Sequence, residues 1–87
     1  MKRQSKTKLL KVLRTLQGYQ RMCLGKDVSI DLQVMIFDDS SIGIIAWITK
    51  DSDFRNLTIY DFLDDEEVAW RLQCATAILK EHGIIKD

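Results

Sequence analysis

The stretch that decides the fold is VSIDLQVMIFDDSSIGIIAWIT, residues 28–49. Over residues 28–37 the apolar side chains alternate, so the even-numbered ones point to one side of an extended chain. Residues 38–41, DDSS, have the short polar side chains of a turn. Residues 42–49 are rich in β-branched side chains, which favour strands. We therefore expect a β-hairpin with strands at 28–37 and 42–49.

The register of this hairpin follows from its apolar residues. The even-numbered residues of both strands bury the most apolar surface when they share a face, and a slip by one residue would move every side chain to the other face. This alignment leaves a second apolar group on the opposite face: Met35, Phe37, Ile45 and Trp47. The outer face of such a sheet is commonly polar because it meets water. These four side chains therefore indicate a contact with something beyond the core.

Three further elements complete the expected fold. Leucines with helical period predict a helix at residues 7–24, and a third, shorter strand is expected at 55–60. A second amphipathic helix should run from residue 65 to about residue 82. The order is then α-β-β-β-α, and the fold class is α+β. Short connections favour a three-stranded antiparallel meander, with the two helices packed on one face.

The second helix carries clear end signals. Asp64 and Glu67 have the spacing of a capping box, in which each side chain would bond the other residue's backbone amide. At the far end, Gly83 followed by Ile84 fits a Schellman motif, in which a left-handed glycine ends the helix. These signals fix both ends of the predicted helix.

Length and composition limit the organisation of the chain. Its 87 residues suffice for one domain, and the apolar content of 46% is typical of a folded globule rather than a disordered chain. We expect a basic, flexible N-terminus at residues 1–6 and a single α+β domain at residues 7–87. There is no proline and no low-complexity linker.

The charges are strongly segregated along the chain. Residues 1–26 contain eight Lys or Arg and no acid, whereas residues 27–87 contain thirteen acids and five bases. A basic helix on an acidic body can hold an anionic partner, hold a second copy, or lie against its own chain. The candidate anion-binding residues share one helix: Lys8, Lys11, Arg14 and Arg21. Lys and Arg in such a face can contact phosphates, so nucleic acid is a possible but not the favoured partner.

The order α-β-β-β-α is also that of double-stranded RNA-binding domains, and the similarity is one of element order. Those domains use lysines at the start of the second helix to contact phosphate. Here that position reads DDEE, residues 64–67, and four acids would repel a phosphate backbone. We therefore do not expect this chain to bind duplex RNA. Carboxylates at this position stabilise the positive end of the helix dipole, although four are more than capping requires.

Apolar residues beyond those needed for the core point to an interaction function. On the second helix, Trp70, Cys74 and Ala77 form a stripe opposite the core stripe. The candidate partner- or dimer-binding residues are Met35, Phe37, Ile45, Trp47, Trp70 and Cys74. Surfaces of this kind mark protein contacts, unless a helix covers the second face or the aromatic side chains fill the sheet edges. We expect a homodimer or a docking site for another protein.

Catalytic and metal-binding patterns are missing from the sequence. His82 is the single histidine, and neither cysteine has the spacing of a metal ligand. Asp51 and Asp53 lack the calcium-loop pattern, because Arg55 stands at the third ligand position. The glycines are scattered, so no phosphate-binding loop is formed. We expect a non-enzyme with no catalytic or metal site and no cofactor.

The sequence also bears on localisation. Lys11 and Arg14 interrupt the N-terminal leucines, so no signal peptide is predicted. The longest strongly apolar run, residues 42–48, is far shorter than the ~20 residues of a membrane helix. We expect a cytoplasmic protein without membrane contact. The function that fits these features best is a small interaction or regulatory module, as in accessory proteins of bacteria, phages or mobile elements.

Overall fold

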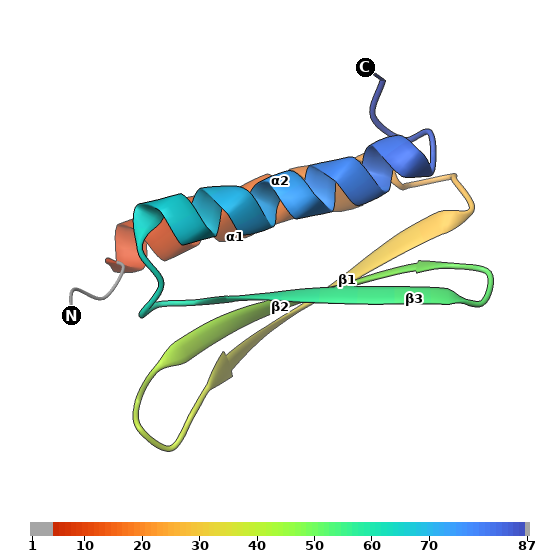
Figure 1. Ribbon diagram of the computed structural model, residues 1–87. Coiled ribbons are helices and arrows are strands. Elements are labelled where there is room, and N and C mark those ends of the chain that lie inside the picture. The colour runs from red at the N-terminus through yellow and green to blue at the C-terminus, as the bar shows by residue number, and fades with distance from the viewer. Residues whose placement is uncertain (1–4, 87) are drawn as a thin grey trace.

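The computed structural model describes residues 5–86. Its elements are helix α1 (Lys6–Met22), strands β1 (Val28–Ile36), β2 (Ile42–Lys50) and β3 (Asp53–Tyr60), and helix α2 (Asp65–Glu81). The strands form one three-stranded antiparallel sheet in the order β1-β2-β3. Both helices lie on the same face of that sheet (Figure 1). The predicted α+β fold with the order α-β-β-β-α is confirmed.

The predicted register of the β1–β2 hairpin is also confirmed. Ile30 pairs with Ile48, and the pairing continues through Ile36 opposite Ile42 without a bulge. The element bounds differ slightly from the predicted ones, since β3 starts at Asp53 rather than residue 55. Helix α1 starts one residue early, at Lys6, and Ser5 is its N-cap, whose hydroxyl accepts a hydrogen bond from the Lys8 amide. The other residues of the predicted flexible N-terminus, 1–4, lie outside the described residues.

The core lies between the helices and the even-numbered side of the β1–β2 hairpin. Helix α1 packs on β1 and α2 packs on β3. The fully buried large side chains come from every element: Leu16, Val28, Ile44, Ile59 and Leu79. Among residues 5–86, no helix is long and apolar enough to cross a membrane.

The two helices run in the same direction, because an odd number of strands separates them in the chain (Figure 1). Two contacts hold them in step. The Tyr19 and Thr76 hydroxyls lie 3.1 Å apart, and Lys8 Nζ lies 3.2 Å from the Asp65 carboxylate. Both helices therefore begin at the same end of the molecule.

Both ends of α2 are capped at the predicted residues, with one difference in the hydrogen bonds at its start. The Asp64 carboxylate accepts a hydrogen bond from the Glu67 amide at 2.8 Å, which is one half of a capping box. The Glu67 carboxylate is instead 3.1 Å from Arg71 Nε, one turn later. At the far end the Ile84 amide donates to the Leu79 carbonyl at 2.8 Å, as in a Schellman motif.

The turn end of the β1–β2 hairpin diverges from the helices (Figure 1). Strand twist rotates this end away from α1, so residues on the helix side of β1 become exposed there. Val34 is 53% exposed and Ile36 is 76% exposed, although Ile30 in the same stripe is buried. The apolar stripe of β1 therefore continues beyond the part that α1 covers.

Candidate interaction surfaces

The face of the sheet that lies away from the helices, which we call the open face, carries the predicted apolar group. Trp47 lies between Asp31 and Asn56 across the strands, and Ile45 lies between Gln33 and Thr58. The four predicted side chains from the hairpin are all half-buried and all belong to this face: Met35, Phe37, Ile45 and Trp47. Both described helices lie on the opposite face (Figure 1).

An aromatic cluster extends this group at the turn end of the sheet. The Phe37 and Tyr60 ring centroids are 5.8 Å apart, and Tyr60 stacks on Phe62 with centroids 4.8 Å apart. The Phe37 ring lies against Gly43, where a Cβ atom would be only 2.9 Å from Phe37 Cε2. Sequence reasoning missed Tyr60 and Phe62. The even-numbered positions of β3 could have indicated Tyr60, since they share this face once the register is known.

The charge of the open face is slightly negative. Every strand residue is described, and the one charged strand side chain on this face is Asp31. Asp38 follows in the β1–β2 turn, beside the aromatic cluster. The strands place no cation on this face, because Lys50 and Arg55 lie on the helix side of the sheet. The open face therefore combines apolar side chains with a small negative charge.

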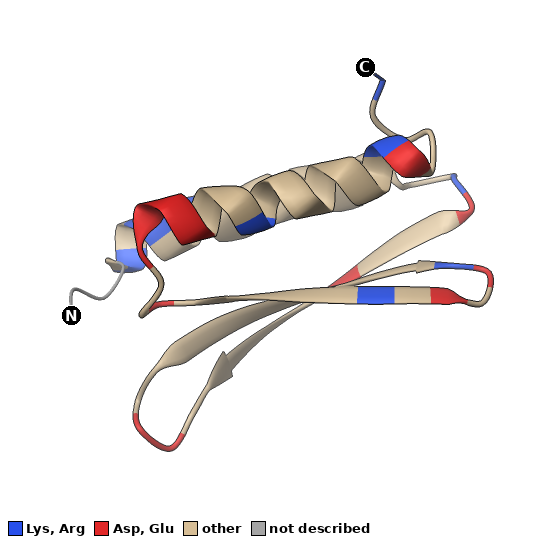
Figure 2. Ribbon diagram, viewed as in Figure 1, with Lys and Arg blue, Asp and Glu red and all other residues tan. Residues whose placement is uncertain are grey.

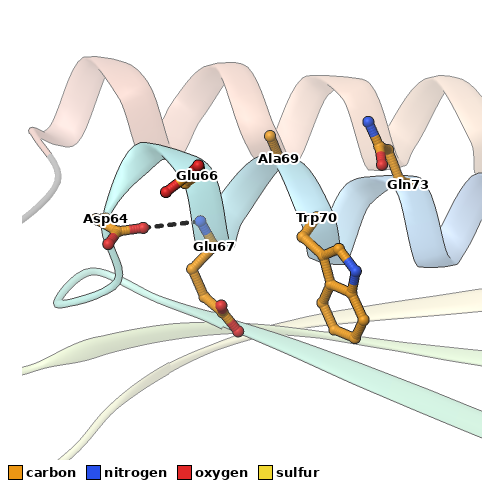
Figure 3. Close-up of a pocket in the computed structure, with 6 residues that line it drawn as sticks. All are labelled: Asp64, Glu66, Glu67, Ala69, Trp70 and Gln73. Atoms are coloured by element: carbon orange, nitrogen blue, oxygen red, sulfur yellow. Dashed lines mark hydrogen bonds between the residues drawn. The ribbon is translucent and has the colours of Figure 1, made fainter.

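The structure links the Trp70 stripe to the open face. Trp70 is 60% exposed, and Figure 3 shows its indole directed from α2 toward the sheet. Trp70, Arg71 and Cys74 line a shallow hollow with residues of β3, among them Thr58 and Tyr60. Tyr60 also lines the hollow beside Phe37. The two predicted apolar surfaces are therefore neighbours around strand β3, which the sequence alone could not show.

The predicted anion-binding residues do not form one free surface. Lys8 forms an ion pair with Asp65 at the start of α2, with 3.2 Å between the charged atoms. Lys11, Arg14 and Arg21 are exposed on α1. Figure 2 shows the basic start of α1 next to the acidic start of α2. The basic helix thus lies partly against its own chain. A separate hollow at the start of α2 is lined by Trp70 and by the acids Asp64, Glu66 and Glu67 (Figure 3).

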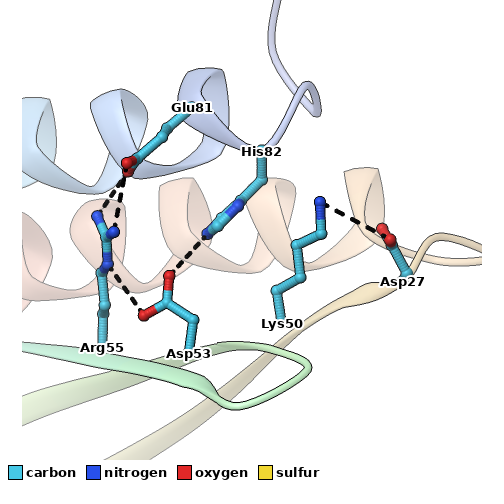
Figure 4. A network of polar contacts seen from close by, with 6 residues as sticks. All are labelled: Asp27, Lys50, Asp53, Arg55, Glu81 and His82. Atoms are coloured by element: carbon cyan, nitrogen blue, oxygen red, sulfur yellow. Dashed lines mark hydrogen bonds and ion pairs between the residues drawn. The ribbon is translucent and has the colours of Figure 1, made fainter.

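The single histidine belongs to a network of polar contacts (Figure 4). Arg55 Nη1 donates to Glu81 at 2.6 Å and Arg55 Nε to Asp53 at 3.3 Å, while His82 Nε2 is 3.6 Å from Asp53. The hydrogen bonds that Arg55 donates to Glu81, and then to Asp53, raise the pKa of its guanidinium. The network joins β3 to the end of α2. Within residues 5–86, no cluster of His, Cys, Asp and Glu could hold a metal ion.

The two cysteines are free thiols in different surroundings. Cys23 is buried directly after α1, and its burial raises the pKa of the thiol. Cys74 is half-buried beside Trp70 on the outer flank of α2. The two thiols are therefore not joined in a disulfide.

Comparison with known proteins adds no relative, because no protein-family model, curated protein or solved structure matches the chain significantly. The arguments for function therefore come from the surfaces described above.

Proposed function

We propose that this protein is a small non-catalytic interaction module that self-associates, as a homodimer, through the open face of its sheet. The observation that carries the proposal is the apolar group on a face that neither described helix covers: Met35, Phe37, Ile45, Trp47 and Tyr60. The role we propose for the protein is a regulatory or accessory one, in the cytoplasm.

Physical chemistry favours a second copy on this face. Two antiparallel sheets pack face to face about 10 Å apart, with their inner side chains interdigitating. Each square ångström of apolar surface that leaves water contributes about 25 cal/mol. Large aromatic side chains near the centre of an interface dominate its energy. Trp47 is on the central strand, whereas Asp31 is on an edge strand and can stay at the hydrated rim.

The two tryptophans allow a direct test, since the chain contains no others. Trp70→Phe leaves Trp47 as the single emitter, and Trp47→Phe leaves Trp70. We expect sedimentation velocity to show a monomer–dimer equilibrium at micromolar concentration. In Trp70→Phe the emission should shift to shorter wavelength as the dimer forms, because Trp47 loses water. In Trp47→Phe the emission of Trp70 should change little.

A disruptive variant sharpens the test. Trp47→Thr keeps a strand-forming residue and should weaken the dimer by about 30-fold or more, which corresponds to ~2 kcal/mol. Trp70→Gln is the matched control on α2 and should leave the dissociation constant nearly unchanged. A dimer that Trp70→Gln disrupts and Trp47→Thr does not would move the interface to the Trp70 stripe. A strict monomer at all accessible concentrations would refute self-association.

A second candidate function is nucleic-acid binding through α1, which the exposure of Lys11, Arg14 and Arg21 favours. It predicts binding that weakens steeply with salt. Changing these three residues to glutamate should abolish that binding. Lys8→Glu should mainly lower stability, since Lys8 is paired with Asp65. Binding that is undetectable, or insensitive to salt, would exclude this function.

A further inference from the structure

A second apolar surface lies between α1 and the outer edge of β1, and we call it the β1 groove. It is lined by Leu10 and Leu13 of α1, by Val34 of β1, and by Ile42 and Ile44 of β2, with Lys6 at its rim. Ile36, at the end of the same strand, is mostly exposed. The groove exists because the twisted hairpin diverges from the start of α1. It is distinct from the open face, which lies on the other side of the sheet.

The backbone beside the β1 groove is that of an edge strand. Gln20 Nε2 donates to the Ile30 carbonyl from outside the sheet, at 2.8 Å. On the inner side, the Phe37 amide donates to the Ser41 carbonyl at 2.9 Å. Backbone groups alternate along an antiparallel strand, so the odd-numbered residues bond β2 and the even-numbered ones point outward. Leu32, Val34 and Ile36 therefore present their amides and carbonyls to an added strand.

The flank of α1 above this edge is cationic. Leu13 and Lys6 line the β1 groove, and Arg14 is one turn on from Leu10. Arg21 lies about three helical turns on from Leu10, so it shares that side of α1. Lys11, in contrast, lies on the other side of the helix, because residues two positions apart, such as Lys11 and Leu13, do not face the same way.

A second copy of this chain fits this edge poorly. Pairing β1 with β1 of another copy in one continuous sheet would bring the two α1 flanks together. The flank of α1 that carries Lys6, Arg14 and Arg21 would then face the same cationic flank of the other copy, and like charges at an interface disfavour association. A segment that carries negative charge would instead be attracted to this cationic flank.

We propose that β1 and its groove bind an extended, acidic and apolar segment of another protein, which adds as a fourth strand beside Leu32–Ile36. Backbone bonds to the edge give such a complex its affinity, and side-chain pockets give it specificity. Apolar side chains of the segment fill the groove beside Leu10 and Val34. Its acidic side chains lie along Arg14 and Arg21. The proposal does not depend on self-association through the open face.

The test uses a phage-displayed library of random dodecapeptides selected on the full-length protein. The enriched peptides should combine apolar residues with a net negative charge. With a synthetic copy of the best peptide bound, hydrogen exchange of the Leu32, Val34 and Ile36 amides should slow by about tenfold or more. Arg14→Glu should weaken peptide binding about 5-fold or more, while its matched control Lys11→Glu should leave binding unchanged.

Val34→Pro adds a second arm, because it removes an outward amide without removing a β1–β2 bond. Val34→Pro should abolish peptide binding while circular dichroism shows the native fold. If Val34→Pro does not fold, the loss of binding in Arg14→Glu tests the proposal instead. Failure to enrich peptides, or enrichment of basic ones, would overturn the proposal. So would peptides whose binding survives Arg14→Glu but is lost in Trp47→Thr, which would place them on the open face. Slowing of the same three amides with rising protein concentration alone would identify a second copy as the occupant.

Discussion

Arg71 Nη1 donates a hydrogen bond to the carbonyl oxygen of Thr58, at 2.6 Å, and so covers part of the free edge of β3. Gln20 does the same for Ile30 on β1, from the other helix. Each helix therefore contributes one side chain to the edge of the strand beneath it. Free strand edges invite pairing with other chains, and native proteins commonly protect them. Here the protection is partial, because each side chain covers one carbonyl.

The first prediction concerns Gln20. Gln20→Leu keeps the approximate volume but removes the donor, so the free energy of unfolding should fall by about 0.5–1.5 kcal/mol. Urea denaturation measures this change. Gln17→Leu, the same substitution one turn earlier on α1, is the control and should have a smaller effect. Equal effects of the two substitutions would show that the Gln20 bond to Ile30 does not contribute.

The second prediction concerns the glycine under the aromatic cluster. In Gly43→Ala the new methyl group would lie 2.9 Å from Phe37 Cε2, so the ring must move away from Tyr60. The aromatic contact should then be lost, at a cost of about 0.5–1.5 kcal/mol in the free energy of unfolding.

In a Phe37→Ala background, the same Gly43→Ala substitution should be neutral or stabilising by about 0.4–1 kcal/mol, because alanine restricts the unfolded chain. A double-mutant cycle in urea measures the coupling between the two positions. Identical effects of Gly43→Ala in both backgrounds would contradict the contact.

The third prediction concerns the start of α2. Asp64→Ala removes the acceptor for the Glu67 amide and should lower the free energy of unfolding by about 1 kcal/mol. Asp65→Ala, one residue later, removes the exposed pair with Lys8 and should cost less, within the ~0–1 kcal/mol range of such pairs. A larger loss in Asp65→Ala than in Asp64→Ala would mean that the ion pair outweighs the cap.

The fourth prediction concerns the ionic network at the other end of α2. Arg55→Gln removes bonds to both Glu81 and Asp53, so the melting temperature should fall slightly at low salt. The difference from the wild type should shrink as salt rises, because exposed ion pairs are screened. Lys80→Gln, a neighbouring cation on α2, provides a comparison for the change in net charge. A loss that persists at high salt would show that Arg55 acts through packing.

The fifth prediction concerns the two thiols. In the folded protein a thiol-reactive dye should label Cys74 first, since Cys23 is buried and burial raises its pKa. The variants Cys23→Ala and Cys74→Ala identify which thiol reacts. Labelling of Cys23 should follow the opening of the native structure and speed up in urea. Rapid labelling of Cys23 under native conditions would contradict its burial.

The same pKa shift makes stability depend on pH. The ordinary thiol pKa is 9.0, and the folded state raises it, so the unfolded chain ionises first as pH increases. The contribution of Cys23 to stability is therefore fully present below pH 9.0 and is lost above it. Cys23→Ala should reduce the decline in stability at alkaline pH more than Cys74→Ala does.

Local rules and the apolar alternation of residues 28–49 were sufficient to predict the element order, the hairpin register and the Schellman end of α2. The Glu67 half of the capping box was predicted wrongly, because Arg71 one turn later offers the Glu67 carboxylate a charged partner. A glycine inside a strand, such as Gly43, commonly marks either a bulge or a close approach of another group. The structure shows a close approach, made by the Phe37 ring.

The three-dimensional relations of the surfaces were beyond sequence reasoning. Exposure of Val34 and Ile36 depends on how far the sheet twists from α1, and no local pattern encodes that distance. The contact between Lys8 and Asp65 depends on the parallel course of the helices, which follows from topology. The proximity of Trp70 to Tyr60 likewise requires α2 to be placed over β3.

The parallel course of α1 and α2 gives the acids at residues 64–67 a second role. Each helix has a partial positive charge at its amino end, and here both such ends lie together. Helix α1 has no acid in its own first turn, whereas α2 has three. The neighbouring carboxylates therefore offset the field of two helices and of Lys8 at once. An even number of strands would have separated these ends, and each helix would then have needed acids of its own.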